Sequence, residues 1–434
     1  MISRSVSAQP GDASTSLTPF QKKVWLLSAL GIFMDGFDLF ILAVALPLIL
    51  TQFSASPLMI GTLGAAAVFG AMFGAILGGR GADRFGRKLL FKIDMGVFLV
   101  GALLSAFAPS LGFLIFARFL LGIGVGADYP IAASYIAEFM PAAMRGRRLV
   151  GAFAFQAVGM LVGALLGIGL LITFKSDWVW RLMLGAGTIP ALVILVFRRG
   201  MPESERWERA GAAEVSPSVR DLFSRVLRRK TVLATVPWFL MDICLYGVGV
   251  FTPTILAILN LTGQTSVIRK DIASSEGAAF LDLFLIVGFG LAIWLVDRAG
   301  RIRLQIIGFA GCAVGLALLT GLTFTNSCGP LKALVFLGFA IFNLSVNAGP
   351  NSATFLLAAE LYPTSVRATG HGFASATGKL GAAFGILLLP LLITSIGLGW
   401  TMAILTLAAL AGLIVTTVFG VETRGDLDQA EAVA

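Results

Sequence analysis

The chain has 434 residues, of which 57% are hydrophobic, 13% are charged and 51 are glycine. Apolar residues and glycine together make up about 69%, against roughly 45–50% in soluble domains, and the charged share is about half the usual one. This composition excludes a soluble enzyme, a disordered chain and a secreted disulfide scaffold. A membrane span needs ~20 apolar residues, so twelve spans would use ~240 of the chain.

A polar tail opens the chain, and twelve apolar stretches follow it. They lie at about 25–50, 59–79, 90–109, 112–137, 149–173, 180–198, 232–259, 278–297, 302–324, 332–360, 369–395 and 398–420. Strands of a membrane barrel alternate with period two and are far less uniformly apolar, so we expect helices.

The predicted fold is an all-α membrane protein with twelve transmembrane helices in two pseudo-symmetric six-helix halves. We expect cytoplasmic tails at 1–22 and 421–434, halves at 23–198 and 232–420, and a cytoplasmic linker at 199–231.

The distribution of positive charge predicts the orientation. Of the 32 lysines and arginines, 25 fall in the tails and in the loops on the same side of the membrane, nine of them from Arg198 to Lys230. Cytoplasmic loops carry such an excess, so both termini are predicted to be cytoplasmic. The net charge of +9 then reflects topology and contact with anionic lipid, not nucleic-acid binding.

Several residue types argue against other chemistry. Cys244, Cys312 and Cys328 lie in separate segments without metal-ligand spacing, and His371 is the one histidine, which excludes a multi-His zinc or iron site. The chain has no Gly-x-x-x-x-Gly-Lys-Ser/Thr loop for ATP. We expect no metal, no cofactor and no enzymatic activity.

One turn motif occurs in both halves. Gly81-Ala-Asp83-Arg84-Phe-Gly86-Arg87-Lys88 follows the second stretch, and Asp297-Arg298-Ala-Gly300-Arg301 follows the eighth. Its recurrence at the same place in each half indicates internal duplication. Each aspartate can bind the N–H groups at a neighbouring helix start, and we expect the arginines to lie at the lipid headgroups.

These loops resemble the signature of the major facilitator superfamily. The segments 138–147 after the fourth stretch, 202–207 after the sixth and 360–367 after the tenth are similar to its sugar-porter-type branch. The resemblance implies a gating or structural role for a set of charged residues, to which we add the intramembrane Arg118: Asp83, Arg84, Arg87, Glu138, Arg145, Asp297, Arg298, Arg301, Glu360 and Arg367.

Ionisable groups also lie inside the apolar stretches, where each costs several kcal/mol and is a functional candidate by default. From the ~1.5 Å rise per residue, Asp35, Asp38, Asp242 and Lys379 lie near the midplane, where transporters bind their substrates. Asp128 lies in the inner half of the fourth span. Arg118 and Asp94 could equally well form structural pairs.

The seventh stretch has three polar residues on one helix face. Trp238, Asp242 and Tyr246 stand at i, i+4 and i+8 and offer an indole donor, a carboxyl group and a phenol. Neutral amides lie in other spans: Gln156, Asn343, Asn347 and Asn351. Each amide could instead form only a helix–helix hydrogen bond.

This polar set suits a small oxygen-rich anion, with Lys379 supplying positive charge. Asp242 repels an anion unless it is protonated, which is useful in a symporter, since loss of the proton would expel the anion. The four aspartates would titrate as a coupled set.

The same residues resemble the phosphate:proton symporter family. The resemblance lies in Gly126-Ala127-Asp128-Tyr129-Pro130, the triad of the seventh stretch, Gly349-Pro350-Asn351, and the segment from Thr369 to Lys379. It implies a phosphate site of Tyr129, Gln156, Trp238, Asp242, Tyr246 and Asn351. It also implies a proton path through Asp35, Asp38 and Asp128, and a Lys379 that balances Asp242.

The predicted function is therefore proton-coupled uptake of phosphate by a monomer in a plasma membrane. The linker is shorter than in fungal and plant members, which suggests a prokaryotic inner membrane. Asp35-Gly36-Phe37-Asp38 also resembles aromatic-acid:proton symporters, so a proton symporter for an organic carboxylate is the main alternative. A sugar porter, a nontransporting nutrient receptor and a passive channel are weaker alternatives.

Overall fold

The fold is described from a computed structural model that covers residues 17–53, 57–174, 176, 178–209, 218–258, 267–325 and 331–423. The regular structure in these ranges is helical, without a strand. Most of both predicted tails, part of the linker and Cys328 lie outside the described residues.

The first half contains six spans, two of them divided into shorter helices. Its elements are α1 (Pro19–Gln52), α2 (Pro57–Phe85), α3 (Arg87–Ala106), α4 (Leu111–Phe139), η1 (Ala142–Met144), α5 (Arg145–Phe153), α6 (Phe155–Phe174), α7 (Val179–Ala186) and α8 (Thr188–Arg198). Here α5 and α6 form the fifth span, and α7 and α8 form the sixth.

The linker contributes two short helices, and the second half follows. The elements are α9 (Glu205–Arg209), η2 (Val219–Phe223), α10 (Arg228–Ile258), α11 (Val267–Ala299), α12 (Arg301–Phe324), α13 (Lys332–Val346), η3 (Asn347–Asn351), α14 (Ser352–Glu360), η4 (Thr364–Val366) and α15 (Arg367–Phe419). The tenth span is one path through α13, the π-helical η3 and α14.

Ten helical segments of the described residues are long and apolar enough to cross a membrane. The last of them, Thr364–Phe419, contains two helices divided at Gly397, whose φ of 84° is not helical. The remaining span is α11, which opens with several ionisable residues. The twelve-helix prediction therefore fits, and the chain is an integral multi-pass membrane protein.

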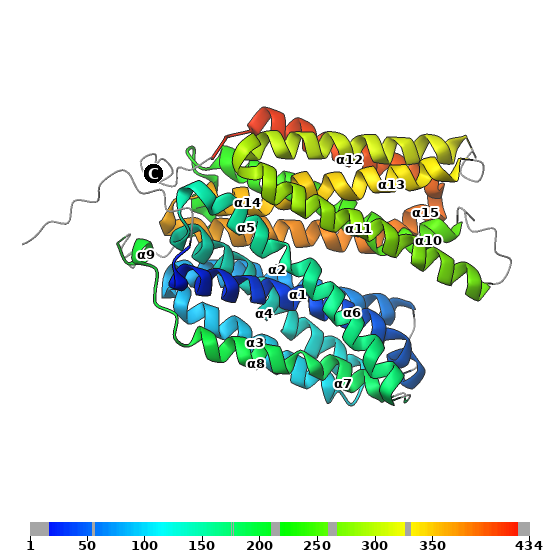
Figure 1. Ribbon diagram of the computed structural model, residues 1–434, viewed down its shortest axis with the longest axis horizontal. Coiled ribbons are helices and arrows are strands. Elements are labelled where there is room, and N and C mark those ends of the chain that lie inside the picture. Colours follow the sequence, from blue (N-terminus) through cyan, green and yellow to red (C-terminus); the bar gives the residue numbers. More distant parts are fainter. Residues whose placement is uncertain are drawn as a thin grey trace, which may run out of the picture.

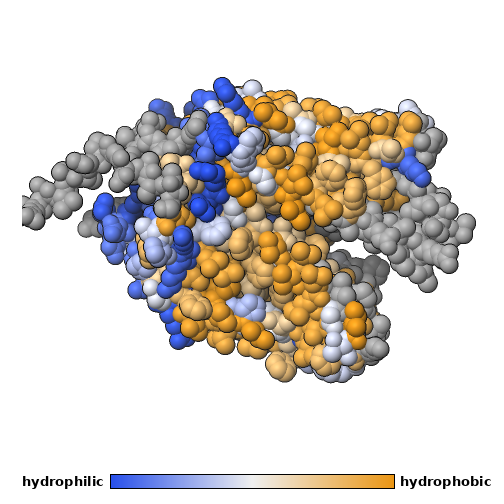
Figure 2. All heavy atoms as spheres, viewed as in Figure 1, coloured by the Kyte–Doolittle hydropathy of each residue, from blue (hydrophilic) through white to orange (hydrophobic). Residues whose placement is uncertain are grey.

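The two halves form two bundles whose helices run roughly along the long axis of the molecule, and the bundles lie side by side across that axis (Figure 1). Apolar residues cover the middle of the surface, and hydrophilic residues gather at the end that carries α9 (Figure 2). We call this end, where Asp83, Glu138 and Arg367 also lie, the motif end. An apolar belt of this kind is what lipid tails require of a protein surface.

The repeated motif forms the same turn in both halves. Gly86 has φ 94° and Gly300 has φ 93°, which a residue with a Cβ rarely adopts. After each turn a glutamate caps the next helix. Glu203 accepts from the backbone N–H groups of Arg87 and Lys88, and Glu422 accepts from those of Arg301 and Ile302, at 3.0–3.2 Å. Glu422, which we expected only as part of the C-terminal tail, thus caps α12.

Candidate functional site

A small cavity lies between the halves. The first half contributes Tyr129 and Gln156 with an apolar neighbour, and the second half contributes the remaining polar groups. The lining residues are Tyr129, Phe153, Gln156, Trp238, Asp242, Leu245, Tyr246, Asn351 and Lys379. The structure thus brings all seven predicted substrate ligands, from α4, α6, α10, η3 and α15, to one place.

Asp35 holds the polar groups of the first half together. Its Oδ2 accepts hydrogen bonds from the Tyr129 hydroxyl and, at 2.6 Å, from Gln156 Nε2. The helices α1 and α6 meet closely because Gly36 has no side chain: a Cβ there would lie 2.0 Å from the Gln156 carbonyl oxygen. This approach places Gln156 beside the carboxylate.

Lys379 forms its ion pair with Asp35, whereas the resemblance implied that it balances Asp242. Its Nζ lies 3.7 Å from Asp35 Oδ2, 4.7 Å from the centre of the Tyr129 ring and 5.9 Å from that of Tyr246. No ion pair within 4 Å joins it to Asp242 in the described part of the chain. Among the described residues Arg118 pairs with Asp38 but no arginine pairs with Asp35, so the Lys379 ammonium supplies the positive charge beside Asp35.

The polar atoms of Trp238 and Asp242 make no hydrogen bond among the described residues. Trp238 and Asp242 are nevertheless only 3% and 4% exposed. Asn351, by contrast, donates to Asn347 Oδ1 at 2.6 Å. Both residues line the cavity, so the indole N–H and the carboxyl can bind a ligand or water there.

Gly378 determines how the second half presents these two groups. A Cβ at this position would lie 2.5 Å from Trp238 Cδ1 and 2.9 Å from Asp242 Oδ2. The backbone of α15 therefore passes directly against the indole and the carboxyl.

We expect Gly378→Ala to weaken substrate binding about tenfold or more, because overpacking costs about 1–3 kcal/mol and displaces both ligand groups. The apparent affinity in a transport assay measures this effect. Gly249→Ala in α10 is the matched control, since nothing lies within 4 Å of its added Cβ. Equal affinities in the two variants would contradict the assignment.

An aromatic wall closes the cavity toward the motif end. Phe153 from α5 and Phe355 from α14 stack with ring centres 4.6 Å apart and an interplanar angle of 10°. The Tyr129 ring meets both edge-on, and Trp238 packs against Phe355. Sequence reasoning missed this pair because single phenylalanines in apolar helices carry no local signal.

The other intramembrane acids are held by arginines. Arg118 binds Asp38 through both of its terminal nitrogens, with Nη1 2.6 Å from Oδ1. Arg198 binds Asp128 at 2.6 Å and Asp94 at 3.0 Å. Counting Arg198 among the linker charges was therefore wrong: it is fully buried, because two carboxylates and the Phe91 ring surround it.

A second small cavity adjoins the first and shares Tyr246 and Lys379 with it. Asp35, Asp38, Tyr246 and Lys379 supply its polar lining, and apolar side chains of α1, α2 and α4 supply the rest. The candidate proton acceptors therefore fall into two kinds: Asp38 and Asp128 paired with arginine, and Asp35 and Asp242 at the cavities.

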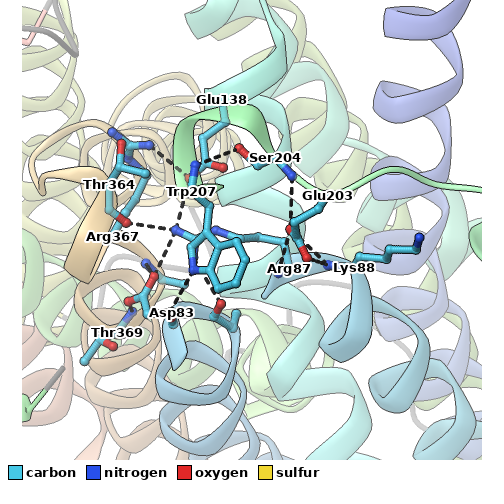
Figure 3. Close-up of polar contacts among 12 residues, drawn as sticks. Asp83, Arg87, Lys88, Glu138, Glu203, Ser204, Trp207, Thr364, Arg367 and Thr369 are labelled. Carbon is cyan, nitrogen blue, oxygen red and sulfur yellow. Dashed lines mark hydrogen bonds and ion pairs between the residues drawn. The ribbon is translucent and has the colours of Figure 1, made fainter. Parts of the chain in front are cut away.

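At the motif end an ion-pair network joins the two halves (Figure 3). Asp83 accepts from the backbone N–H groups of Ala368 and Thr369 at the start of α15, at 3.2 and 2.6 Å. Glu138 lies 3.1 Å from both Arg87 and Arg367, and Arg87 also donates to the Thr364 carbonyl at 2.9 Å. These contacts close the motif end.

The second copy of the motif makes the corresponding contacts, with its aspartate in the second half and the bound helix in the first half. Asp297 accepts from the backbone N–H of Arg147 at 3.0 Å, near the start of α5. Arg301 lies 3.1 Å from Glu360. Both aspartates thus bind the helix start expected of them. Arg145 is buried nearby and donates to the Met140 carbonyl at 3.4 Å.

The expectation that the motif arginines lie at the lipid headgroups is wrong for two of the four. Arg84 and Arg298 are exposed, but Arg87 and Arg301 are buried. Each of the buried pair has two acidic partners, which makes up for the loss of water around the guanidinium.

Comparison with known proteins identifies the architecture. Residues 28–355 match the family model of the Major Facilitator Superfamily. The chain is 30% identical to the putative niacin/nicotinamide transporter NiaP of Bacillus subtilis, over 93% of this chain and 97% of that protein. It is 27% identical to the low affinity inorganic phosphate transporter 4 of Petunia hybrida, over 83% and 82%.

A solved structure has the same fold. The proton:xylose symporter XylE bound to 6-bromo-6-deoxy-D-glucose superposes with a TM-score of 0.81 and 21% identity, covering 95% of this chain and 99% of that one. The proteins named in these comparisons are transporters, and none is an enzyme.

Proposed function

Since this chain belongs to the Major Facilitator Superfamily, we propose that it takes up inorganic phosphate together with protons by alternating access. The observation that carries the proposal is the cavity in which both halves present hydrogen-bond donors while the motif end is closed. In this proposal the motif end is cytoplasmic, as the charge distribution indicates, and the protein is a monomer of a prokaryotic inner membrane.

The donor set fits a tetrahedral oxyanion better than a sugar. Two phenols, an indole, two amides and an ammonium converge on the cavity, and Asp242 beside them makes no hydrogen bond among the described residues. Charge-assisted hydrogen bonds to phosphate are strong, and Lys379 supplies the positive charge. A neutral sugar needs neither that ammonium nor Asp242.

Asp242 couples the proton to the anion in this mechanism. A protonated carboxyl donates a hydrogen bond to phosphate, whereas a carboxylate at the same place repels it. Phosphate therefore binds with the proton and is expelled when the proton leaves. The inorganic phosphate transporter relative adds support for the substrate.

A carboxylate symporter is the second candidate, because of the aromatic wall. The Phe153–Phe355 stack beside Trp238 could pack against a planar aromatic acid, and the relative described as a niacin/nicotinamide transporter is 30% identical. The two rings stack directly on each other, however, so a planar acid has no room between them. The small cavity beside them suits a compact anion better.

Binding of radiolabelled phosphate to the purified protein at acidic pH tests the substrate class. We expect excess nicotinate, benzoate or glucose to leave phosphate binding unchanged. Displacement by nicotinate or benzoate, with no saturable phosphate binding, would replace phosphate with the carboxylate.

Tyr246→Phe should weaken phosphate binding about ten- to a hundredfold, because a hydrogen bond to a charged partner contributes about 1.5–3 kcal/mol. The same binding assay measures it. Tyr362→Phe is the control: that buried hydroxyl donates to Thr231 at 3.3 Å, outside the cavity. An unchanged affinity in Tyr246→Phe would remove this residue from the site.

A further inference from the structure

Three of the proposed phosphate ligands are already engaged with one carboxylate. Tyr129, Gln156 and Lys379 all direct their polar atoms to Asp35 Oδ2, the last at 3.7 Å. Tyr129 and Gln156 lie in the first half and Lys379 in the second, so the contact also spans the interface between them. Asp35 itself is 5% exposed and lines the adjoining cavity.

We propose that Asp35 acts as a built-in competitor of phosphate, and that proton binding to Asp35 releases Tyr129, Gln156 and Lys379 for the anion. This inference rests on the proposed function and adds a second proton-dependent step to it. A carboxylate and a phosphate oxygen accept the same hydrogen bonds, so the three donors cannot serve both fully at once.

Protonation changes this balance. A neutral carboxyl accepts weaker hydrogen bonds and no longer attracts the Lys379 ammonium, so the three donors turn to the phosphate oxygens. When Asp35 loses its proton, it takes them back and phosphate leaves. The proton and the anion therefore favour each other's binding, and by linkage phosphate binds more weakly as pH rises.

Asp35 faces other charged and titratable groups that define its surroundings. On α1 itself lies Asp38, which Arg118 of α4 neutralises. The remaining neighbours are Tyr129 on α4, Asp242 and Tyr246 on α10, and Lys379 on α15. Asp128 with Arg198 lies beside Gly31, one turn nearer the motif end. Of these, Tyr129 donates a hydrogen bond to Asp35 and Lys379 forms an ion pair with it. The neutral Gln156 of α6 donates a second hydrogen bond.

The experiment measures phosphate affinity of the full-length protein between pH 5 and pH 8.5 for wild type and Asp35→Asn. Phosphate itself ionises identically in both experiments. The difference between the two slopes of affinity against pH therefore measures the contribution of the Asp35 side chain. We expect Asp35→Asn to bind phosphate about tenfold more tightly than wild type at the alkaline end, and to lose part of the pH slope. A wild-type slope in the variant would overturn the proposal.

Removal of any buried carboxylate could attract an anion, and Asp94→Asn controls for this. Asp94 is a buried acid of the same half, but it binds Arg198 and none of the three donors. We expect this variant to keep the wild-type slope. A gain in Asp94→Asn equal to that in Asp35→Asn would reduce the effect to charge alone and contradict donor release.

Infrared difference spectra of the wild type provide a test that needs no variant to fold. Addition of phosphate at constant pH should produce new protonated-carboxyl absorption, and this absorption should be smaller in Asp35→Asn where that variant is folded. No protonated-carboxyl signal in the wild type would overturn the inference. Absence of phosphate binding to wild type at every pH would instead refute the proposed function.

Discussion

We expect Asp242→Asn to abolish accumulation of phosphate against its gradient while exchange of phosphate across the membrane continues. The amide has nearly the same shape as the carboxyl and can still donate a hydrogen bond to phosphate, but it cannot carry a proton. A pH difference of one unit is worth about 1.4 kcal/mol per proton. One coupled proton thus supports about tenfold accumulation, and the variant should lose this contribution.

Proteoliposomes with an imposed proton gradient measure accumulation, and preloaded vesicles measure exchange. The pH slope of phosphate binding that is due to Asp35 should persist in Asp242→Asn, which separates the two acids. Near-normal accumulation driven by the gradient in this variant would refute the role of Asp242.

The second large effect is expected at the motif end. Glu138→Gln removes the charge that lies 3.1 Å from both Arg87 and Arg367, in a place where none of the three side chains is exposed. Loss of one partner from a buried ion pair costs about 3–5 kcal/mol. Because this contact joins the halves only while the motif end is closed, the variant should shift toward an open motif end and transport far more slowly.

Spin labels at Ala143 and Arg303, two exposed positions of opposite halves at this end, would report the change as a longer distance between labels. Glu205→Gln is the matched control, because the ion pair of Glu205 with Arg209 is exposed and lies within α9. An unchanged distance in Glu138→Gln, with uptake preserved, would show that the network does not hold the halves together.

Much of the fold could be predicted because the membrane imposes simple rules. Apolar length predicts spans, and the repeated Asp–Arg–x–Gly–Arg turn predicts a duplicated architecture whose positive-φ glycines the structure contains. The spacing of Trp238, Asp242 and Tyr246 placed three side chains on one face, and all three line the cavity. Periodicity within one helix suffices for such inferences.

Partner choice between helices could not be predicted in the same way. Lys379 lies within ion-pair distance of Asp35 and not of Asp242, and Arg198 lies between Asp94 and Asp128 instead of at a membrane surface. These pairings depend on how α1, α3, α4, α8 and α15 approach one another. Gly31 of α1 faces Asp128 and Arg198, and Gly124 of α4 faces the Asp94 carbonyl, so these close contacts help to set that approach. Nothing in the local sequence reveals which carbonyl or side chain a glycine will face.

In the proposed mechanism the cavity and the motif-end network act together. Phe153 and Phe355 belong to short helices, α5 and α14, that run between the cavity and the network. The helix α5 ends at an interruption at Ala154, and α14 begins after the π-helical Asn347–Asn351. π-Helical turns occur often at functional sites. Opening of the motif end would therefore separate the aromatic stack and release the anion on that side.

Uptake of radiolabelled phosphate into proteoliposomes, with an inward proton gradient and with the gradient collapsed by a protonophore, tests proton coupling most directly. We expect accumulation above equilibrium in the first case and none in the second. Uptake that only equilibrates in both cases would contradict proton coupling. Folded protein that carries nicotinate or benzoate but no phosphate would contradict the substrate.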